Sequence, residues 1–227
     1  MKKAVSAIIK DVRTAIDEIA LNDADFAEGE DNQELDSIIC SKIKEAVDFV
    51  HGNASYDLIN IKDAETVISV IYSGEKGSTI GMTEEDGKVF LVNKPGDMLR
   101  FLSGTMSCWG EIILETTDAG TEDYVLAHNP VVGATPFRPA IAYGGTVFKF
   151  LRATSATDKV TLKYIPVCGY DHTADNSTTK EITINNSLYT ALIYQLAGLT
   201  LLTLGEQRAD DMFNLAMTHM GINGRKE

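Results

Sequence analysis

Hydrophobic residues recur at helical spacing near both ends of the chain and at strand-like spacing between them. Across residues 3–21 the apolar side chains lie three or four positions apart, which is the period of an amphipathic helix. Residues 31–52 repeat the pattern, and Gly52 stands where the helix should end. Two such helices joined by a short loop usually pack antiparallel, so we expect a helical pair at the start of the chain.

The end of the chain carries a second helical pair. Residues 182–205 contain no charged side chain, and their most apolar part, residues 188–204, is hydrophobic on every side. This stretch is shorter than the ~20 apolar residues of a membrane span and contains several polar residues, so we predict a helix surrounded by protein, with no membrane insertion. Residues 206–220 then form an amphipathic helix, and Gly221 is its expected C-cap.

The middle of the chain has the pattern of a β-rich region. Short segments rich in branched and aromatic residues are separated by Gly, Asp, Asn or Pro. We predict strands at residues 66–72, 88–92, 98–102, 111–116, 124–128, 146–151, 159–165 and 180–184. The best hairpin candidate joins residues 146–151 to residues 159–165.

These patterns predict an α+β fold with two domains. Residues 1–62 and 182–227 should form one discontinuous domain, an antiparallel helical bundle built from the N- and C-terminal helices. Residues 63–181 should form a large antiparallel β-rich insertion, folded as a small sandwich or barrel.

Residues 129–145 form the one long segment without a periodic pattern. They hold three of the five prolines, and Phe137, Arg138 and Tyr143 are interleaved with them. Long irregular loops are often contact elements, and a stiff surface excursion without a partner is the alternative. Both interpretations stay open at this point.

Charge and cysteine content restrict the function. The chain has 20 Lys and Arg against 33 Asp and Glu, giving a net charge of −13, and no basic cluster. Such a surface repels nucleic-acid phosphates, so sequence-specific nucleic-acid binding is not expected. The three cysteines are scattered, which does not indicate a disulfide framework. Lys10, Asp11 and Arg13 interrupt the first apolar run, which therefore does not have the pattern of a signal peptide.

No motif in the sequence indicates catalysis. An acidic cluster between Asp17 and Asp36 matches part of a calcium-binding loop, but Glu28 stands where the sharp turn requires glycine. Cys168, Asp171 and His172 are the only grouping that invites an enzymatic interpretation, and a turn between strands explains them as well. We therefore expect no enzyme activity, no metal and no cofactor.

Two segments resemble a known family. The opening "DVRTAIDEIALND…NQELDSIICSKIKEAVDFV" and the closing "ALIYQLAGLTLLTLGEQRADDMFNLAMTHMG" resemble the head-to-tail adaptor, or connector ring, proteins of tailed bacteriophages. The large β-rich insertion is more similar to the versions in short-tailed and crAss-like phages than to the all-helical adaptors. The resemblance covers residues 3–50 and 188–221 and does not extend to the insertion.

The resemblance implies a structural protein of the virion, assembled in the host cytoplasm. Such proteins form a ring, typically twelvefold, between the portal protein and the tail hub or other tail proteins. DNA passes through this ring without specific binding, and an acidic lining would let it slide. Acids between Asp17 and Asp36, or those near Glu115, Asp118, Glu122 and Asp123, are our candidates for the lumen or rim.

A closed ring needs two different complementary faces on each subunit. The helix that is apolar on all sides could supply more than one face, so we predict subunit contacts by Tyr189, Ile193 and Leu201. Phe137, Arg138 and Tyr143 are the candidate partner contacts of the insertion. The alternative function is a β-rich binding module, carbohydrate-binding or associated with a tail fibre, on a helical base.

Overall fold

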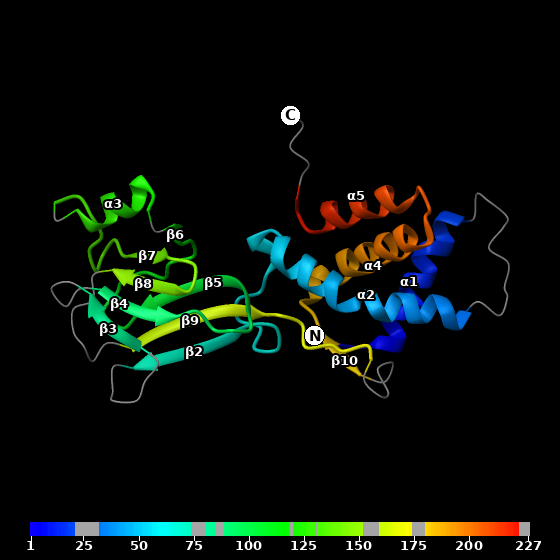
Figure 1. Cartoon of the computed structure of the whole chain (residues 1–227), viewed down its shortest axis with the longest axis horizontal. Coiled ribbons are helices and arrows are strands. Elements are labelled where there is room, and N and C mark those ends of the chain that lie inside the picture. The colour runs from blue at the N-terminus through cyan, green and yellow to red at the C-terminus, as the bar shows by residue number, and fades with distance from the viewer. Residues whose placement is uncertain are drawn as a thin grey trace. The chain divides into compact units, whose positions relative to one another are not determined.

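The computed structural model describes residues 1–20, 32–73, 80–84, 89–118, 120–129, 131–151, 159–173 and 180–222. Within these residues the fold is mixed α+β, with five α-helices and ten strands in three sheets (Figure 1). The chain divides into two compact units. One is Met1–Thr66 together with Val167–Glu227, and the other is Val67–Pro166.

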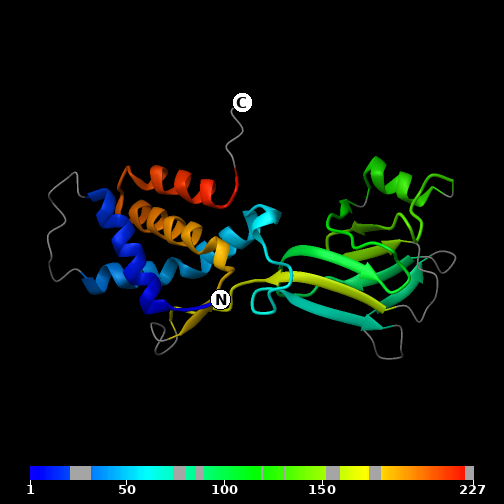
Figure 2. The ribbon, with the colours of Figure 1, turned by 180° about the vertical axis from the view of Figure 1, so that it is seen from behind.

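The first unit is built around one buried helix. Its helices are α1 (Val5–Ala20), α2 (Asn32–Asn53), α4 (Tyr189–Leu204) and α5 (Ala209–His219), which confirms the four helices predicted from periodicity. Helix α4 contacts all three of the others, and two opposite views show it directly beside α5 (Figures 1 and 2). Its buried positions lie on every side of the helix, so α4 forms the centre of this unit.

The apolar stripes of the other helices face inward. Ile8 on α1, Ile43 on α2 and Met212 on α5 are fully buried. Burying a side chain of this size contributes about 1.5–3 kcal/mol to folding. Gly198 lets α5 approach α4 closely, because an added Cβ would lie 2.6 Å from the Phe213 ring. Gly205 ends α4 in the left-handed conformation, with φ of 78°, as a helix C-cap.

The stretch Asn186–Leu204 also meets the length and composition of a membrane span. It has 19 residues and is apolar enough to cross a membrane, but most of it is buried inside the protein. A core helix of a globular protein has the same composition, because both must be apolar on all sides. The contacts of α4 with α1, α2 and α5 therefore favour the role of a core helix.

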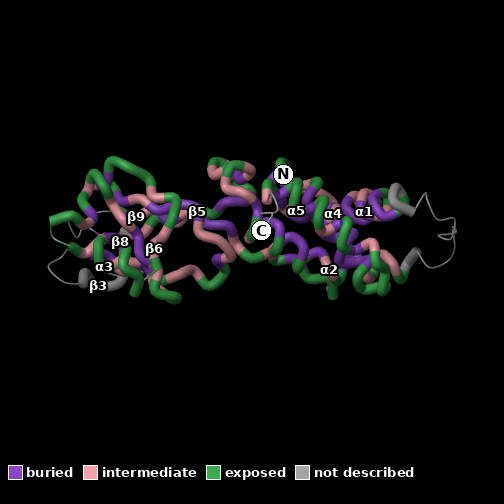
Figure 3. Tube along the Cα trace, turned by 90° about the horizontal axis from the view of Figure 1, so that it is seen from above, coloured by how far each residue is buried: buried purple, intermediate pink, exposed green. Residues whose placement is uncertain are grey.

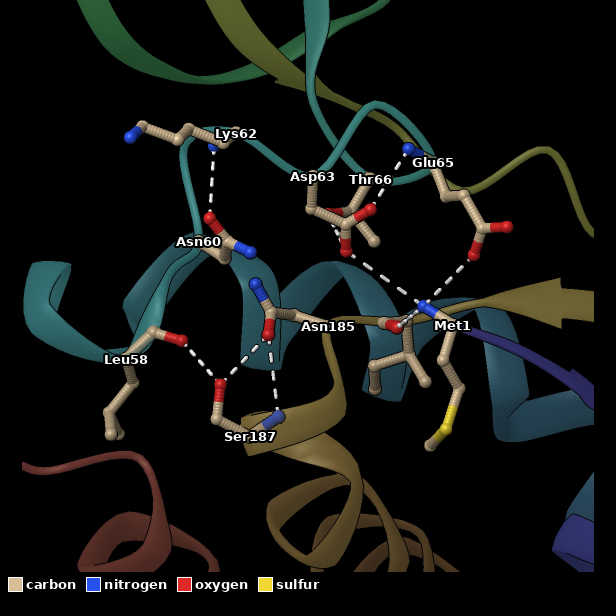
Figure 4. A network of polar contacts seen from close by, with 10 residues as sticks. Met1, Leu58, Asn60, Lys62, Asp63, Glu65, Thr66, Asn185 and Ser187 are labelled. Carbon is tan, nitrogen blue, oxygen red and sulfur yellow. Dashed lines mark hydrogen bonds and ion pairs between the residues drawn. The ribbon is translucent and has the colours of Figure 1, made fainter.

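Polar contacts fix the first residue of the chain against the segment that precedes α4 (Figure 4). Strand β1 (Lys2–Ala4) pairs antiparallel with β10 (Glu181–Thr183). Beyond this pair, the Met1 amino group donates to the Ile184 carbonyl at 2.7 Å and forms an ion pair with Glu65 at 3.2 Å. The strand predicted at residues 180–184 is thus present and belongs to the helical unit.

The same region holds the entrance to α4. The side chain of Asn185 accepts a hydrogen bond from the backbone N–H of Ser187 at 3.3 Å and caps the short helical turn before α4. The Ser187 hydroxyl donates to the carbonyl of Leu58 at 2.6 Å (Figure 4). The start of the chain, the segment that leaves the helical unit and the segment that returns to it are therefore joined by hydrogen bonds and ion pairs.

The second unit contains two sheets. The three-stranded sheet has the antiparallel order β2-β9-β5, formed by Ile68–Ser73, Lys159–Pro166 and Met98–Met106. The five-stranded sheet has the order β3-β4-β8-β7-β6, formed by Ile80–Glu84, Val89–Asn93, Val147–Leu151, Ala140–Tyr143 and Thr117–Asp118. Among the strand pairs of the described residues, the short β6–β7 pair is the one that is parallel.

Both sheets contribute to one hydrophobic core. Met106 and Leu162 of the first sheet pack in the same cluster as Phe148 and Phe150 of the second. Gly104 lies where the sheets approach closely, because a Cβ there would collide with the Ile141 side chain. The backbone of β5 can therefore approach the five-stranded sheet closely at this position.

Four sequence-based predictions for this unit were wrong. The predicted hairpin between residues 146–151 and 159–165 does not form, because β8 pairs with β4 and β7 whereas β9 pairs with β2 and β5. Residues 111–116 form no strand, only an isolated bridge between Ile113 and Gly104. Residues 124–128 belong to helix α3 (Glu122–His128), and the segment predicted as irregular, residues 129–145, contains β7.

The first testable consequence concerns His51, which is buried in α2. Burial, together with the positive charge of the Met1 amino group, lowers the pKa of His51 to about 4 from 6.5. Below pH 6.5 the unfolded chain therefore binds a proton that the folded chain does not. We expect the free energy of unfolding of the helical unit to be about 2 kcal/mol lower at pH 5 than at pH 7.5.

Urea unfolding followed by helical circular dichroism between pH 7.5 and pH 4 measures this difference. His51→Gln should flatten the stability profile between pH 6.5 and pH 4, whereas the exposed His172→Gln should leave it unchanged. An unchanged slope in His51→Gln would show that another group causes the acid sensitivity.

Candidate docking surface

Exposed hydrophobic side chains gather in one stretch of the second unit. Seven of the fifteen large hydrophobic residues that are exposed in the described part of the chain lie between residues 112 and 137. They are Ile112, Leu114, Val125, Leu126, Val131, Val132 and Phe137. Val131 is 88% exposed and Phe137 is 81% exposed, so neither side chain is covered by the protein itself. We call these seven residues the docking surface. In Figure 3 the segment around α3 is largely green, the colour of exposed residues.

Helix α3 supplies two of the seven residues. The Thr121 side chain caps its first turn by accepting a hydrogen bond from the backbone N–H of Tyr124 at 3.4 Å. Lys149 of β8 donates to the Tyr124 hydroxyl at 3.1 Å. No residue of this helix is buried, and Val125 and Leu126 point away from the core. The helix is thus attached through this polar contact and through Ala127, which packs against a small buried cluster, while Val125 and Leu126 remain exposed.

The loop after α3 is held by hydrogen bonds to its own backbone. The Asn129 side chain accepts from the backbone N–H of Val131 at 2.8 Å and of Val132 at 3.2 Å. The N–H of Ala134 donates to the carbonyl of Ala127 at 2.8 Å. An Asn side chain that bonds the backbone two residues on defines an Asx turn. Val131 and Val132 are therefore presented on a turn of defined geometry.

A second turn presents Phe137. Thr135 and Arg138 exchange backbone hydrogen bonds of 3.0 Å in both directions, with Pro136 and Phe137 between them. The N–H of Gly110 donates to the Pro136 carbonyl at 3.2 Å, which anchors the turn to the segment that carries Ile112 and Leu114. The most exposed aromatic residue of this unit thus stands on a closed turn that is bonded to its neighbour.

Acidic side chains border the docking surface. Glu111, Glu115, Asp118, Glu122 and Asp123 are all exposed, and no Lys or Arg occurs between Arg100 and Arg138. Beside α3 lies an open hollow of about 420 Å³, lined mainly by small and apolar residues together with Asp123 and Arg138. The surface therefore combines apolar projections, a shallow hollow and a negative rim.

The structure separates the three residues predicted as partner contacts of the insertion. Phe137 and Arg138 are adjacent and exposed on the second turn of the docking surface. Tyr143 lies in β7, stacks on Phe148 with ring centroids 4.8 Å apart, and donates to the carbonyl of Gly145. Its ring is thus occupied by contacts within the sheet. Of the three residues, Phe137 belongs to the docking surface and Arg138 lies next to it in the sequence.

The three residues predicted as subunit contacts of α4 are mostly occupied within the chain. Ile193 and Leu201 are only 7% and 4% exposed, because α1, α2 and α5 surround α4. Tyr189 is half-buried, and its hydroxyl donates to Asp11 at 2.6 Å. The apolar residues of α4 that do reach the surface are Leu202 and Leu204 in its last turn.

Of the residues that invited an enzymatic interpretation, Asp171 and His172 line an open pocket of about 470 Å³, whereas Cys168 is not among its lining residues. Asp171 and His172 are exposed, and the backbone N–H of Cys168 donates to Asp48 at 2.7 Å. Burial raises the pKa of the Cys168 thiol, which disfavours the thiolate that a nucleophile requires. Among the described residues, no group of three or more His, Cys, Asp or Glu could hold a metal ion. Residues 21–31 of the predicted acidic cluster lie outside the described residues.

Gly133 provides a test of the turn geometry. A Cβ at this position would lie 2.5 Å from the backbone oxygen of Ala127 and even closer to that of Asn129, and no side-chain rotation relieves such a clash. We expect Gly133→Ala to destabilise the loop by about 1–3 kcal/mol. Hydrogen exchange of the amides at residues 133 and 134 should become much faster in the variant.

The matched control is Gly110→Ala, because Gly110 is exposed and an added Cβ there meets no atom within 4 Å. Its exchange rates should equal those of the unchanged protein. Equal rates in Gly133→Ala would mean that the loop does not depend on this close approach.

Comparison with known proteins does not assign the chain to a family. No protein-family model matches the sequence, and no curated protein is similar to it.

Proposed function

We propose that this protein is a non-enzymatic structural component of a phage particle, a ring between the portal and the tail. The observation that carries the proposal is the cluster of seven exposed hydrophobic side chains on one unit of the chain. Large exposed apolar patches mark sites of interaction with proteins or membranes and grooves that bind ligands. The resemblance of both chain ends to connector ring proteins supplies the kind of assembly.

The fold we propose for this role is an antiparallel helical bundle that carries a β-rich insertion. Contacts of α4 with helices from both ends of the chain support the bundle. The shared core of the two sheets supports a small sandwich as the insertion. A rigid bundle would form the ring, and the insertion would carry the surface for the next component of the particle.

A ring requires contacts between unlike faces of identical subunits. The helical unit offers exposed apolar residues at the end of α4 and on α5, namely Leu202, Leu204, Leu215 and Met217. We propose that this second apolar region contacts the neighbouring subunit. The docking surface is then available to bind the portal protein or the tail hub. The assembly takes place in the host cytoplasm, without membrane insertion, and the protein ends up in the virion.

Negative charge suits a channel protein, because carboxylates do not bind DNA phosphates. The net charge of −13 therefore supports passage of DNA without specific binding. Asp36 is not free for this role, since Arg13 pairs with it at 2.6 Å. Four other candidate acids flank the docking surface in the sequence, namely Glu115, Asp118, Glu122 and Asp123. We therefore propose that they surround the docking surface and do not line the DNA channel of the ring.

A β-rich binding module on a helical base is the second candidate function. The observation in its favour is the exposed aromatic ring of Phe137 beside Arg138, near an open hollow of about 420 Å³. Aromatic faces beside polar groups can bind sugars as well as proteins. Glycan-array binding that is lost in Phe137→Ala would favour this module over the ring protein.

The ring proposal predicts self-association through the last turn of α4. Leu202 is 59% exposed, and burying such a side chain contributes about 1.5–3 kcal/mol. We expect Leu202→Asp with Leu204→Asp to raise the concentration needed for assembly at least tenfold, by the usual relation of about 1.4 kcal/mol per factor of ten. Light scattering during size-exclusion chromatography and electron microscopy, with and without the portal protein of the same genome, measure the assembly.

Asn214→Asp is the control, because it adds negative charge at an exposed polar position of α5 without removing apolar surface. This variant should assemble like the unchanged protein. A single copy of the unchanged protein in every sample, including the one with portal, would contradict the ring.

A further inference from the structure

We propose that the docking surface binds a segment of a different protein in which apolar residues are flanked by lysine or arginine. This inference rests on the proposed function and names the chemistry of the partner that the structural component would bind. It follows from the fixed geometry of the surface and from the sign of the charges around it.

The geometry favours binding without prior ordering of the surface. The two turns that present Val131, Val132 and Phe137 are closed by backbone and side-chain hydrogen bonds of 2.8–3.2 Å. A surface that is already ordered loses little conformational entropy when a partner binds. Exposed aromatic residues held in this way are typical anchors of protein interfaces. The apolar part of the partner segment would therefore pack against these side chains and into the adjacent hollow.

The charges around the surface require a cationic partner. Five acidic side chains border it, at Glu111, Glu115, Asp118, Glu122 and Asp123. Among the described residues, the cations next to it are Lys149, whose ammonium group donates to the Tyr124 hydroxyl at 3.1 Å, and Arg138. Within this part of the chain the acids outnumber the cations. Lysine or arginine on either side of an apolar segment would face these carboxylates, which raises the association rate and selects the partner.

The same charges disfavour a second copy of this chain as the occupant. Two docking surfaces that face each other would bring two acidic rims together, and like charges across an interface cost binding free energy. The proposed contact between identical subunits uses the helical unit instead, where Leu202 and Leu204 are exposed. Nucleic acids and anionic lipid surfaces are disfavoured by the same repulsion.

A synthetic peptide tests this chemistry directly. The probe has a short apolar core with one tryptophan, flanked on both sides by lysine pairs, and its fluorescence reports binding to the full-length protein at physiological ionic strength. We expect saturable binding that weakens at least tenfold in Phe137→Ala. Glu122→Gln with Asp123→Asn should weaken binding severalfold and reduce its salt dependence. A peptide with glutamate in place of lysine should not bind, and neither should one that keeps the lysines but lacks the apolar core.

Each control makes the same kind of substitution at an exposed position of the helical unit. Phe49→Ala removes an exposed phenylalanine of the helical unit, and Asp210→Asn with Asp211→Asn neutralises an exposed acidic pair on α5. Both should bind the peptide like the unchanged protein. Equal binding by Phe137→Ala, or equal binding of the glutamate peptide, would overturn the inference.

Light scattering on the same samples separates this inference from the proposed function. Rings without peptide binding would refute the partner chemistry and leave the structural role intact. Peptide binding by a protein that never assembles would refute the ring and support the partner chemistry alone. Loss of the assembly itself in Phe137→Ala would identify a second copy as the occupant and would also overturn the inference.

Discussion

The fold of the helical unit depends on the burial of α4. This helix has no charged side chain to place in water and is apolar on most of its surface, so its stability requires protein around it. Helices from both ends of the chain meet that requirement, and each contributes one apolar stripe. The short β1–β10 pair and the hydrogen bonds at Asn185 and Ser187 then fix how α4 begins. The hydrophobic effect thus brings distant segments together, and the polar contacts select their arrangement.

The second unit contains one set of buried and one set of exposed hydrophobic residues. Phenylalanine and leucine side chains of the two sheets are buried in one core, where Gly104 allows close approach. Val131, Val132 and Phe137 are instead exposed to solvent, on turns that are closed by hydrogen bonds. Exposing this much apolar surface costs solubility and favours association, so a monomeric protein has little reason to keep it. The contrast between the two sets is the main support for a docking role.

The sequence predicted the helices well and the strand partners poorly, for physical reasons. Helical periodicity is local, because each stripe of α1, α2 and α5 is read from one segment. Strand pairing is not local, and nothing in residues 147–151 indicates that they pair with β4 and β7 but not with β9. The branched residues around Tyr124 predict a strand. The structure has a helix there, because the Thr121 cap and the acids at Glu122 and Asp123 favour a helix start.

The candidate site was predictable only in part. The prolines and aromatic residues of 129–145 indicated a contact loop, and Phe137 and Arg138 do lie exposed in it. Val131 and Val132 were missed, because an apolar residue in a sequence normally indicates burial. Ile193 and Leu201 were expected at a surface because α4 is apolar all round, but its neighbours cover them. The number of helices packed around a given helix is a tertiary property that no local pattern contains.

One consequence follows from the way the chain passes between its units. The polypeptide leaves the helical unit at Thr66 and returns at Val167, so the second unit has two covalent connections to the first. The outgoing segment is held where Glu65 pairs with the amino group of Met1, and the returning segment is held where the backbone N–H of Cys168 donates to Asp48. A mechanical load applied to the second unit would be shared by two strands of backbone. Such a double attachment would resist separation of the two units better than a single linker.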